Sequence, residues 1–177
     1  MRKTLLTTAV LLLAACASNP SPVYHTLPNS SFIMPEQTRG KTETAVRVIL
    51  AEPLNRGGLG YRPADGQLNL AHGHLWAQPL EQALASRLSN ELNRAGNPIR
   101  YYVPAHQSSS SHVVTIYIED FSGSWQGETL VAGYLRNGNG SRRFVANTPQ
   151  IGDGYPAMVQ SLSQGINAAV RQINRGE

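Results

Sequence analysis

Two pairs of side chains in the sequence have residue types that could form a chemical site. His72 and His74 stand two apart in "HGH", a spacing that places both imidazoles on one face of a strand, where a metal ion could bridge them. A zinc site needs a third ligand, and Asp65 is the acidic residue closest in sequence. Because Gly73 separates the histidines and no H-E-x-x-H pattern is present, the sequence favours a turn with water-facing imidazoles over a metal site.

The second pair is Glu119 and Asp120, two adjacent carboxylates. Neighbours on a strand point to opposite faces, so they make a poor acid/base pair, and we expect them to end a strand. The nucleophile patterns G-x-S-x-G and S-x-x-K are absent. "GNGSRR" (138–143) precedes an expected strand, so no helix N-terminus is there to bind phosphate. We therefore predict no catalytic residue, no metal ligand and no cofactor.

Cys16, the only cysteine, offers a different chemistry. Arg2 and Lys3 precede a mostly apolar segment of 11 residues, 5–15, which has the layout of an export signal and is too short for a bilayer span of about 20 residues. Leu13-Ala14-Ala15-Cys16 resembles the lipobox of bacterial lipoproteins, where the thiol is acylated and the chain is cut before the cysteine. The alternative is an incidental cysteine near an Ala-x-Ala cleavage site.

This interpretation divides the chain into a signal peptide (1–15), a lipidated N-terminus and tether (16–22) and one periplasmic domain (23–177). A lone cysteine at the mature N-terminus leaves the domain without disulfides. The residue after it is Ala17 rather than the Asp associated with inner-membrane retention, so the resemblance implies an outer-membrane anchor facing the periplasm.

The charge balance excludes a large class of partners. Removing Arg2 and Lys3 with the signal leaves 13 basic and 11 acidic residues, so the formal net charge falls from +4 to +2. That charge is too small for a nucleic-acid binder, and export excludes such a role as well.

The expected elements follow from hydrophobic periodicity and turn residues. One helix is expected within 76–98, where leucines recur every four residues between Pro79 and Gly96, and a second at 155–174. Gly165 interrupts the second helix and would permit a close approach to the sheet. Strands are expected at 23–27, 45–54, 58–62, 67–71, 99–103, 112–121, 128–137 and 141–148. The order predicts an α+β two-layer sandwich, with two amphipathic helices on one face of a largely antiparallel sheet.

The two tryptophans are candidates for a partner interface. Trp76 precedes the first helix, where it either fixes the helix entry to the core, the interpretation we favour, or anchors a partner. Trp125 lies in the expected loop "SGSWQGE" and is the better interface candidate, because large aromatic residues are unusual in exposed loops.

Four short sequence motifs, spread over nearly the whole mature chain, resemble those of a known protein family. "VYHTLP" (23–28), "LNR" with "YR" (54–62), "WAQPLEQAL" (76–84) and "VVTIYIEDFSG" (113–123) resemble the ABC-type transport auxiliary lipoproteins, a family that includes PqiC. "WAQPLEQAL" is the most specific of them. At 55–58 the chain reads Asn-Arg-Gly-Gly where many members of the family have "DRPQ".

The resemblance implies a non-enzymatic subunit of an intermembrane lipid transport system. Its partners would be a periplasmic tunnel protein of the MCE type (PqiB-like) and, through it, an inner-membrane component, with this domain docking the tunnel at the outer membrane. Because a tunnel end is a symmetric ring, a homo-oligomer is expected. Two alternatives stay open: a structural or assembly lipoprotein of another envelope complex, and a periplasmic hydrolase.

Overall fold

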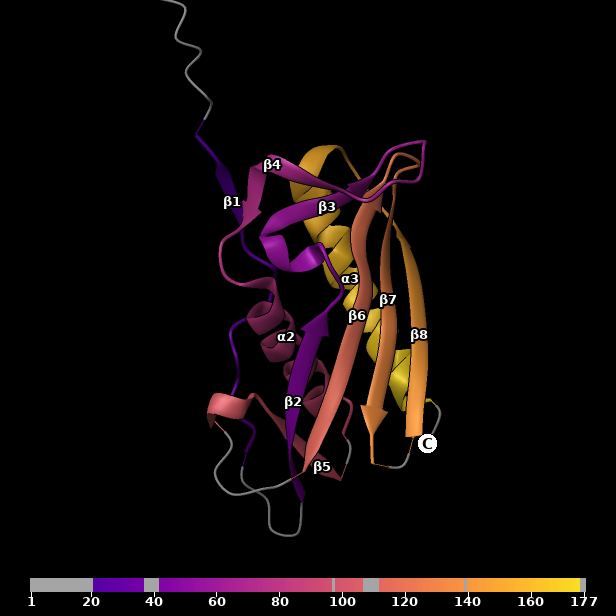
Figure 1. The fold of residues 1–177 in the computed structure, drawn as a ribbon. Coiled ribbons are helices and arrows are strands. Elements are labelled where there is room, and N and C mark those ends of the chain that lie inside the picture. The colour runs from indigo at the N-terminus through magenta and orange to yellow at the C-terminus, as the bar shows by residue number, and fades with distance from the viewer. Residues whose placement is uncertain (1–20, 37–41, 97, 107–111, 139, 176–177) are drawn as a thin grey trace, which may run out of the picture.

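One mixed sheet and two helices make up the domain (Figure 1). The computed structural model describes residues 21–36, 42–96, 98–106, 112–138 and 140–175. Their strands are β1 (Val23–His25), β2 (Thr42–Leu50), β3 (Gly58–Arg62), β4 (Asn69–Trp76), β5 (Ile99–Tyr102), β6 (Val113–Ser124), β7 (Glu128–Asn137) and β8 (Gly140–Pro149). The helices are α2 (Leu80–Arg94) and α3 (Gly154–Asn174), and two 3₁₀ turns are η1 (Leu54–Arg56) and η2 (Pro104–His106).

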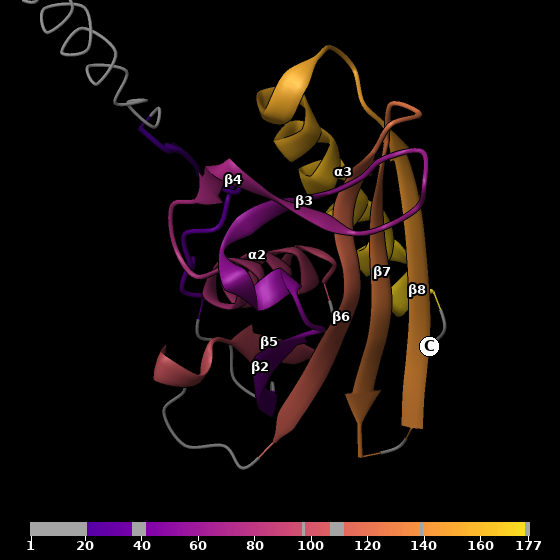
Figure 2. The same ribbon diagram turned by 45° about the horizontal axis from the view of Figure 1, so that its top comes forward.

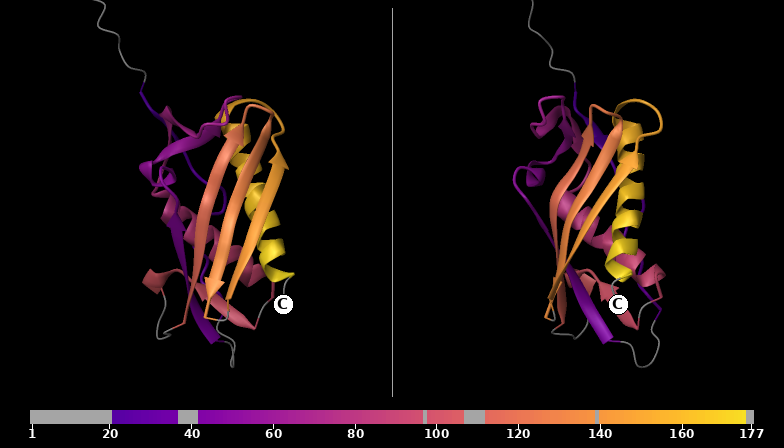
Figure 3. Two further views of the ribbon diagram at one scale, coloured as in Figure 1. Left: turned by 45° about the vertical axis from the view of Figure 1, so that its right-hand side comes forward. Right: turned by 90° about the vertical axis from the view of Figure 1, so that its right-hand side faces the viewer.

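Both helices cover the same face of the sheet, as the side views show (Figure 3). The leucine repeat of α2 is buried as its spacing predicts: Leu80, Leu84, Leu88 and Leu92 are 4% exposed or less. α2 packs on β2 and β5, and α3 packs on β6, β7 and β8, so one core joins both helices to the sheet. The predicted α+β two-layer arrangement is confirmed.

Gly165 sets the distance between α3 and the sheet. A Cβ at this position would lie 2.7 Å from Val131 Cγ2 on β7 and 3.4 Å from Thr148 Oγ1 on β8. The first distance is too short for a carbon–carbon contact, so a larger residue here would force Val131 or the helix to shift. The predicted role of Gly165 is confirmed.

The sheet is less antiparallel than its turns predict. The β3–β4 hairpin and the β6–β7–β8 meander are antiparallel, as expected from their short connections. β1 pairs parallel with β4, β5 with β2, and both β2 and β3 with β6. Parallel neighbours need a long crossover, and here η1, β3, β4 and α2 intervene between β2 and β5. Periodicity identifies strands but does not indicate which distant strands will pair.

β6 also runs further than predicted. Glu119–Asp120 does not end the strand, which continues to Ser124 through a register shift between Ile118 and Asp120. The extra residue is a β-bulge that bends β6. As a result, the first part of β6 pairs with β2 and the last part with β3, while β7 follows the other side.

Candidate functional site

The two tryptophans have opposite environments. Trp76, at the end of β4, is 6% exposed, and its ring lies 5.8 Å from that of Phe121 on β6. Trp76 therefore lies in the core, which is the interpretation that the sequence favours, and it is not exposed for a partner in this structure. Trp125 remains 64% exposed. Its role in a partner interface stays a prediction.

The turn that presents Trp125 is tightly bonded. The Trp125 N–H donates to the Arg62 carbonyl (2.9 Å), and the Gly127 N–H donates to the Ser124 carbonyl (3.1 Å). The Gln126 N–H donates to Ser124 Oγ (3.2 Å). The β6–β7 turn is therefore held beside the β3–β4 hairpin, with the indole directed outward.

His72 and His74 do not form a site together. His72 is exposed, whereas His74 faces His25 on the parallel strand β1, with His25 Nε2 2.9 Å from His74 Nδ1. Asp65 accepts a hydrogen bond from the Gln67 N–H within its own turn (3.0 Å). Within the described ranges, no group of three His, Cys, Asp or Glu side chains could hold a metal ion.

Tyr155, at the start of α3, completes this cluster. Its ring stacks on His74 with centroids 4.0 Å apart. Burial and the neighbouring His74 lower the pKa of His25, and burial together with Tyr61 raises the pKa of Tyr155. Both shifts favour the neutral forms of His25 and Tyr155, whose rings lie with His74 at the contact between β1, β4 and α3. Sequence reasoning missed His25, because its partner lies 49 positions away.

The two adjacent carboxylates have separate basic partners. Asp120 pairs with Arg62 on β3 and accepts a hydrogen bond from Ser122 Oγ (2.5 Å). Glu119 pairs with Arg143 on β8 (2.6 Å). The Asp120 pair joins the neighbouring strands β6 and β3, and the Glu119 pair reaches from β6 across β7 to β8. Because each carboxylate is bound to its own arginine, the two do not form an acid/base pair.

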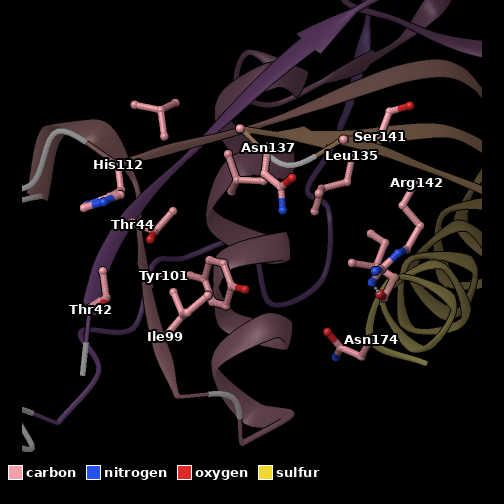
Figure 4. A pocket seen from close by; sticks show the side chains of 15 residues that line it. Thr42, Thr44, Ile99, Tyr101, His112, Leu135, Asn137, Ser141, Arg142 and Asn174 are labelled. Carbon is pink, nitrogen blue, oxygen red and sulfur yellow. Dashed lines mark hydrogen bonds between the residues drawn. The ribbon is translucent and has the colours of Figure 1, made fainter. Parts of the chain in front are cut away.

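A cleft of about 750 Å³ opens between the layers at the end of the domain where the chain finishes (Figure 4). Its apolar wall comes from Ile99, Tyr101, Val114, Leu135 and Ile173. Arg142 on its rim donates a hydrogen bond to the Ile173 carbonyl. The described residues that line the cleft include His112 and Ser141 but no carboxylate and no thiol.

Cys16 lies outside the described residues. In the part of the chain that the structure describes, neither helix combines the length and the apolar character required to cross a bilayer.

Comparison with known proteins identifies relatives along the whole chain. Residues 31–174 match a family model described as ABC-type transport auxiliary lipoprotein component. The intermembrane transport lipoproteins PqiC of Escherichia coli and Shigella flexneri are each 29% identical to this chain over 192 aligned positions, covering 99% of both chains.

Solved structures share the fold. An uncharacterised protein of 24% identity superposes with a TM-score of 0.72 over 88% of this chain and 98% of its own. A Xanthomonas campestris protein of 14% identity gives a TM-score of 0.59 over 85% of this chain and 92% of its own.

Proposed function

Because this chain belongs to the family of ABC-type transport auxiliary lipoproteins, we propose that it is an outer-membrane lipoprotein subunit of an intermembrane lipid transport system. The observation that carries the proposal is the end-to-end alignment with the PqiC lipoproteins. The alignment covers 99% of this chain, so it extends over the segment that contains Leu13-Ala14-Ala15-Cys16.

In this proposal the role is positional and not catalytic. The family is one of transport auxiliary components. The polar groups singled out as catalytic candidates are engaged in structural contacts, such as the Arg62–Asp120 and Arg143–Glu119 ion pairs. A domain fixed to a membrane at one end and built around one rigid core is suited to hold another protein in place.

The partner we propose is an MCE-type tunnel protein (PqiB-like), linked through it to an inner-membrane component. The domain would dock the tunnel at the outer membrane and support envelope integrity. Because such a tunnel ends in a ring, we also propose that the domain assembles as a homo-oligomer.

The anchor is tested by Cys16→Ser in the full-length chain. Mass spectrometry of the wild-type protein should find acyl chains on Cys16 and no residues 1–15, and cell fractionation should place it in the outer membrane. The Cys16→Ser protein should be unacylated and lost from the membrane fraction. Retention of that variant with envelope lipid would contradict the anchor.

The partner is tested separately, by purification from detergent-solubilised envelopes after chemical crosslinking. An MCE-domain protein should be recovered with the wild-type chain and lost with Cys16→Ser, which has the same domain without the membrane anchor. Repeated recovery of a different envelope complex would favour the structural or assembly role instead.

A further inference from the structure

Four large apolar side chains are exposed at one end of the domain. Val23 and Tyr24 on β1 are 49% and 62% exposed, Trp125 is 64% exposed, and Ile151, between β8 and α3, is 83% exposed. We call these four residues the tether-side tip. They come from three separate segments, and the views agree that these segments reach the same end (Figures 1 and 3).

Contacts within the protein hold these segments together. The Gln150 N–H donates to the Gly127 carbonyl (2.8 Å), which places the loop of Ile151 beside the turn of Trp125. The stack of His74 on Tyr155 places β4, and β1 paired to it, beside the start of α3. Figure 2 turns this end toward the viewer, with the β3–β4 hairpin crossing in front of β6 and β7. The tip is therefore one continuous part of the fold.

The sequence fixes how far this end can be from the anchor. Six residues separate Cys16 from Val23. Fully extended, a segment of that length spans only about 20 Å. An acylated Cys16 would therefore keep β1, and with it the whole tip, close to the bilayer surface.

We infer that the tether-side tip contacts the lipid bilayer that holds the anchor, with Trp125 and Tyr24 at the level of the headgroups. This inference rests on the proposed acylation of Cys16. Trp and Tyr are the residues enriched at this level of membrane proteins, because their rings are apolar and carry one polar atom. Ile151 and Val23 add apolar surface without any polar group.

The backbone N–H groups of the Trp125 turn can be removed from water without losing their hydrogen bonds. The N–H groups of Trp125, Gln126 and Gly127 all donate within the protein, to Arg62, Ser124 Oγ and Ser124 respectively. Unsatisfied backbone groups are the main cost of placing a loop against lipid, and these donors do not incur it. An ordinary surface turn would lose hydrogen bonds to water in the same position.

The charges of this end indicate the kind of lipid surface. Asp65 in the β3–β4 turn, Glu128 at the start of β7 and Asp153 just before α3 are exposed. Anionic lipids would be repelled by them, so the contact depends on apolar insertion, and zwitterionic phosphatidylcholine vesicles are the appropriate probe.

The experiment compares two full-length, acylated proteins in such vesicles: wild type and Trp125→Phe. Trp125 is exposed, so this substitution leaves the core intact. In wild type, tryptophan emission should shift to shorter wavelength on reconstitution. Lipids brominated about 5–10 Å below the surface should quench it, because interfacial side chains reach that depth. In Trp125→Phe only Trp76 remains, buried against Phe121, and neither the shift nor the quenching should occur.

The outcomes distinguish a failure of the proposed membrane contact from a failure of the proposed anchor. If mass spectrometry finds no acyl chain on Cys16, the proposed anchor fails. If Cys16 is acylated and brominated lipids quench wild type no more than Trp125→Phe, the membrane contact is overturned while the anchor stands. A Trp125 emission that changes only when another envelope protein is added would also overturn the contact, and would return Trp125 to a protein interface.

Discussion

The two halves of this domain are held together in different ways. In the C-terminal half, β6, β7, β8 and α3 follow one another in space in the order of the chain, joined by short connections. In the N-terminal half, β1 pairs with β4, while β2 and β3 each pair with the distant β6. The C-terminal half is built from local contacts and the N-terminal half from long-range ones. We therefore expect the C-terminal half to tolerate a disturbance of the N-terminal half better than the reverse.

The largest expected effect on stability comes from adding one methyl group on β7, opposite the β6 bulge. A Cβ on Gly133 would lie 1.9 Å from the Tyr117 carbonyl oxygen, a backbone atom that cannot move without separating β6 from β7. We expect Gly133→Ala to lower the free energy of unfolding by about 3 kcal/mol or more. Urea denaturation followed by circular dichroism measures the change.

The matched control lies in the other half. Gly73 on β4 has nothing within 4 Å of an added Cβ. Gly73→Ala should leave the free energy of unfolding unchanged or raise it by up to about 1 kcal/mol, because alanine restricts the unfolded chain. If both variants lost the same free energy of unfolding, the close approach at Gly133 would not be the cause of the loss.

The next largest effect concerns the joint between the halves. Arg87 on α2 is 2% exposed, pairs with Glu91, and donates to Asn167 Oδ1 on α3 (2.7 Å). Glu91→Gln would leave a buried cation without its counter-charge, at a cost of about 3 kcal/mol. Arg87→Met replaces the buried ion with an apolar side chain and should stay within about 1 kcal/mol of wild type.

Thermal and urea unfolding of both variants check this expectation. If Arg87→Met were the more damaging of the two, the hydrogen bond to Asn167 between the helices would outweigh the cost of the buried charge. The two halves would then depend on a polar link and not on their shared core.

The difference between the halves also explains what could be predicted from the sequence. The bounds of β7 and α3 follow from alternation, a turn and an apolar stripe, and the structure places them at Glu128–Asn137 and Gly154–Asn174. The neighbours of β2 and β3 did not follow, because they depend on contacts with β6 that no local pattern records. The same limit applies to the candidate site: Trp125 is exposed as its loop predicts, but His25 meets His74 only through the β1–β4 pairing.

In each half, an amide side chain on a helix forms two hydrogen bonds to the backbone of an edge strand. Comparing the two contacts tests how burial changes their contribution to the free energy of unfolding. Asn93 on α2 accepts from the Tyr101 N–H (2.9 Å) and donates to the Tyr101 carbonyl (2.8 Å) on β5. Gln172 on α3 binds the Val145 N–H (3.0 Å) and carbonyl (2.8 Å) on β8 in the same way. Tyr101 is buried and Val145 is exposed.

We expect Asn93→Ala to cost about 1–3 kcal/mol, because water does not easily replace a lost partner at a buried backbone. Gln172→Ala should cost less than about 1 kcal/mol, since water reaches Val145. Urea midpoints of the two variants measure the difference, and equal costs would show that burial does not decide the strength of this contact.

The smallest expected effect is a pH dependence confined to the β1 attachment. His25 faces His74 and Tyr155, and Tyr61 lies near Tyr155; burial and His74 lower the pKa of His25 below its ordinary value of 6.5. At a pH between the lowered value and 6.5 the unfolded chain binds more protons than the folded one, so stability falls as the pH drops. The contribution of this group is complete above about pH 6.5 and is lost as the pH falls through the folded pKa.

Replacing this histidine isolates the effect. His25→Gln removes the titrating ring but keeps an amide that can bond to His74, so its urea midpoint should fall less between about pH 7.5 and pH 5 than that of wild type. His72→Gln changes an exposed histidine of the same strand as His74 and should keep the wild-type slope. If His25→Gln and wild type lose stability in parallel, the acid sensitivity arises elsewhere. The contact of His25 with His74 would then add no pH-dependent stability to the β1–β4 pairing.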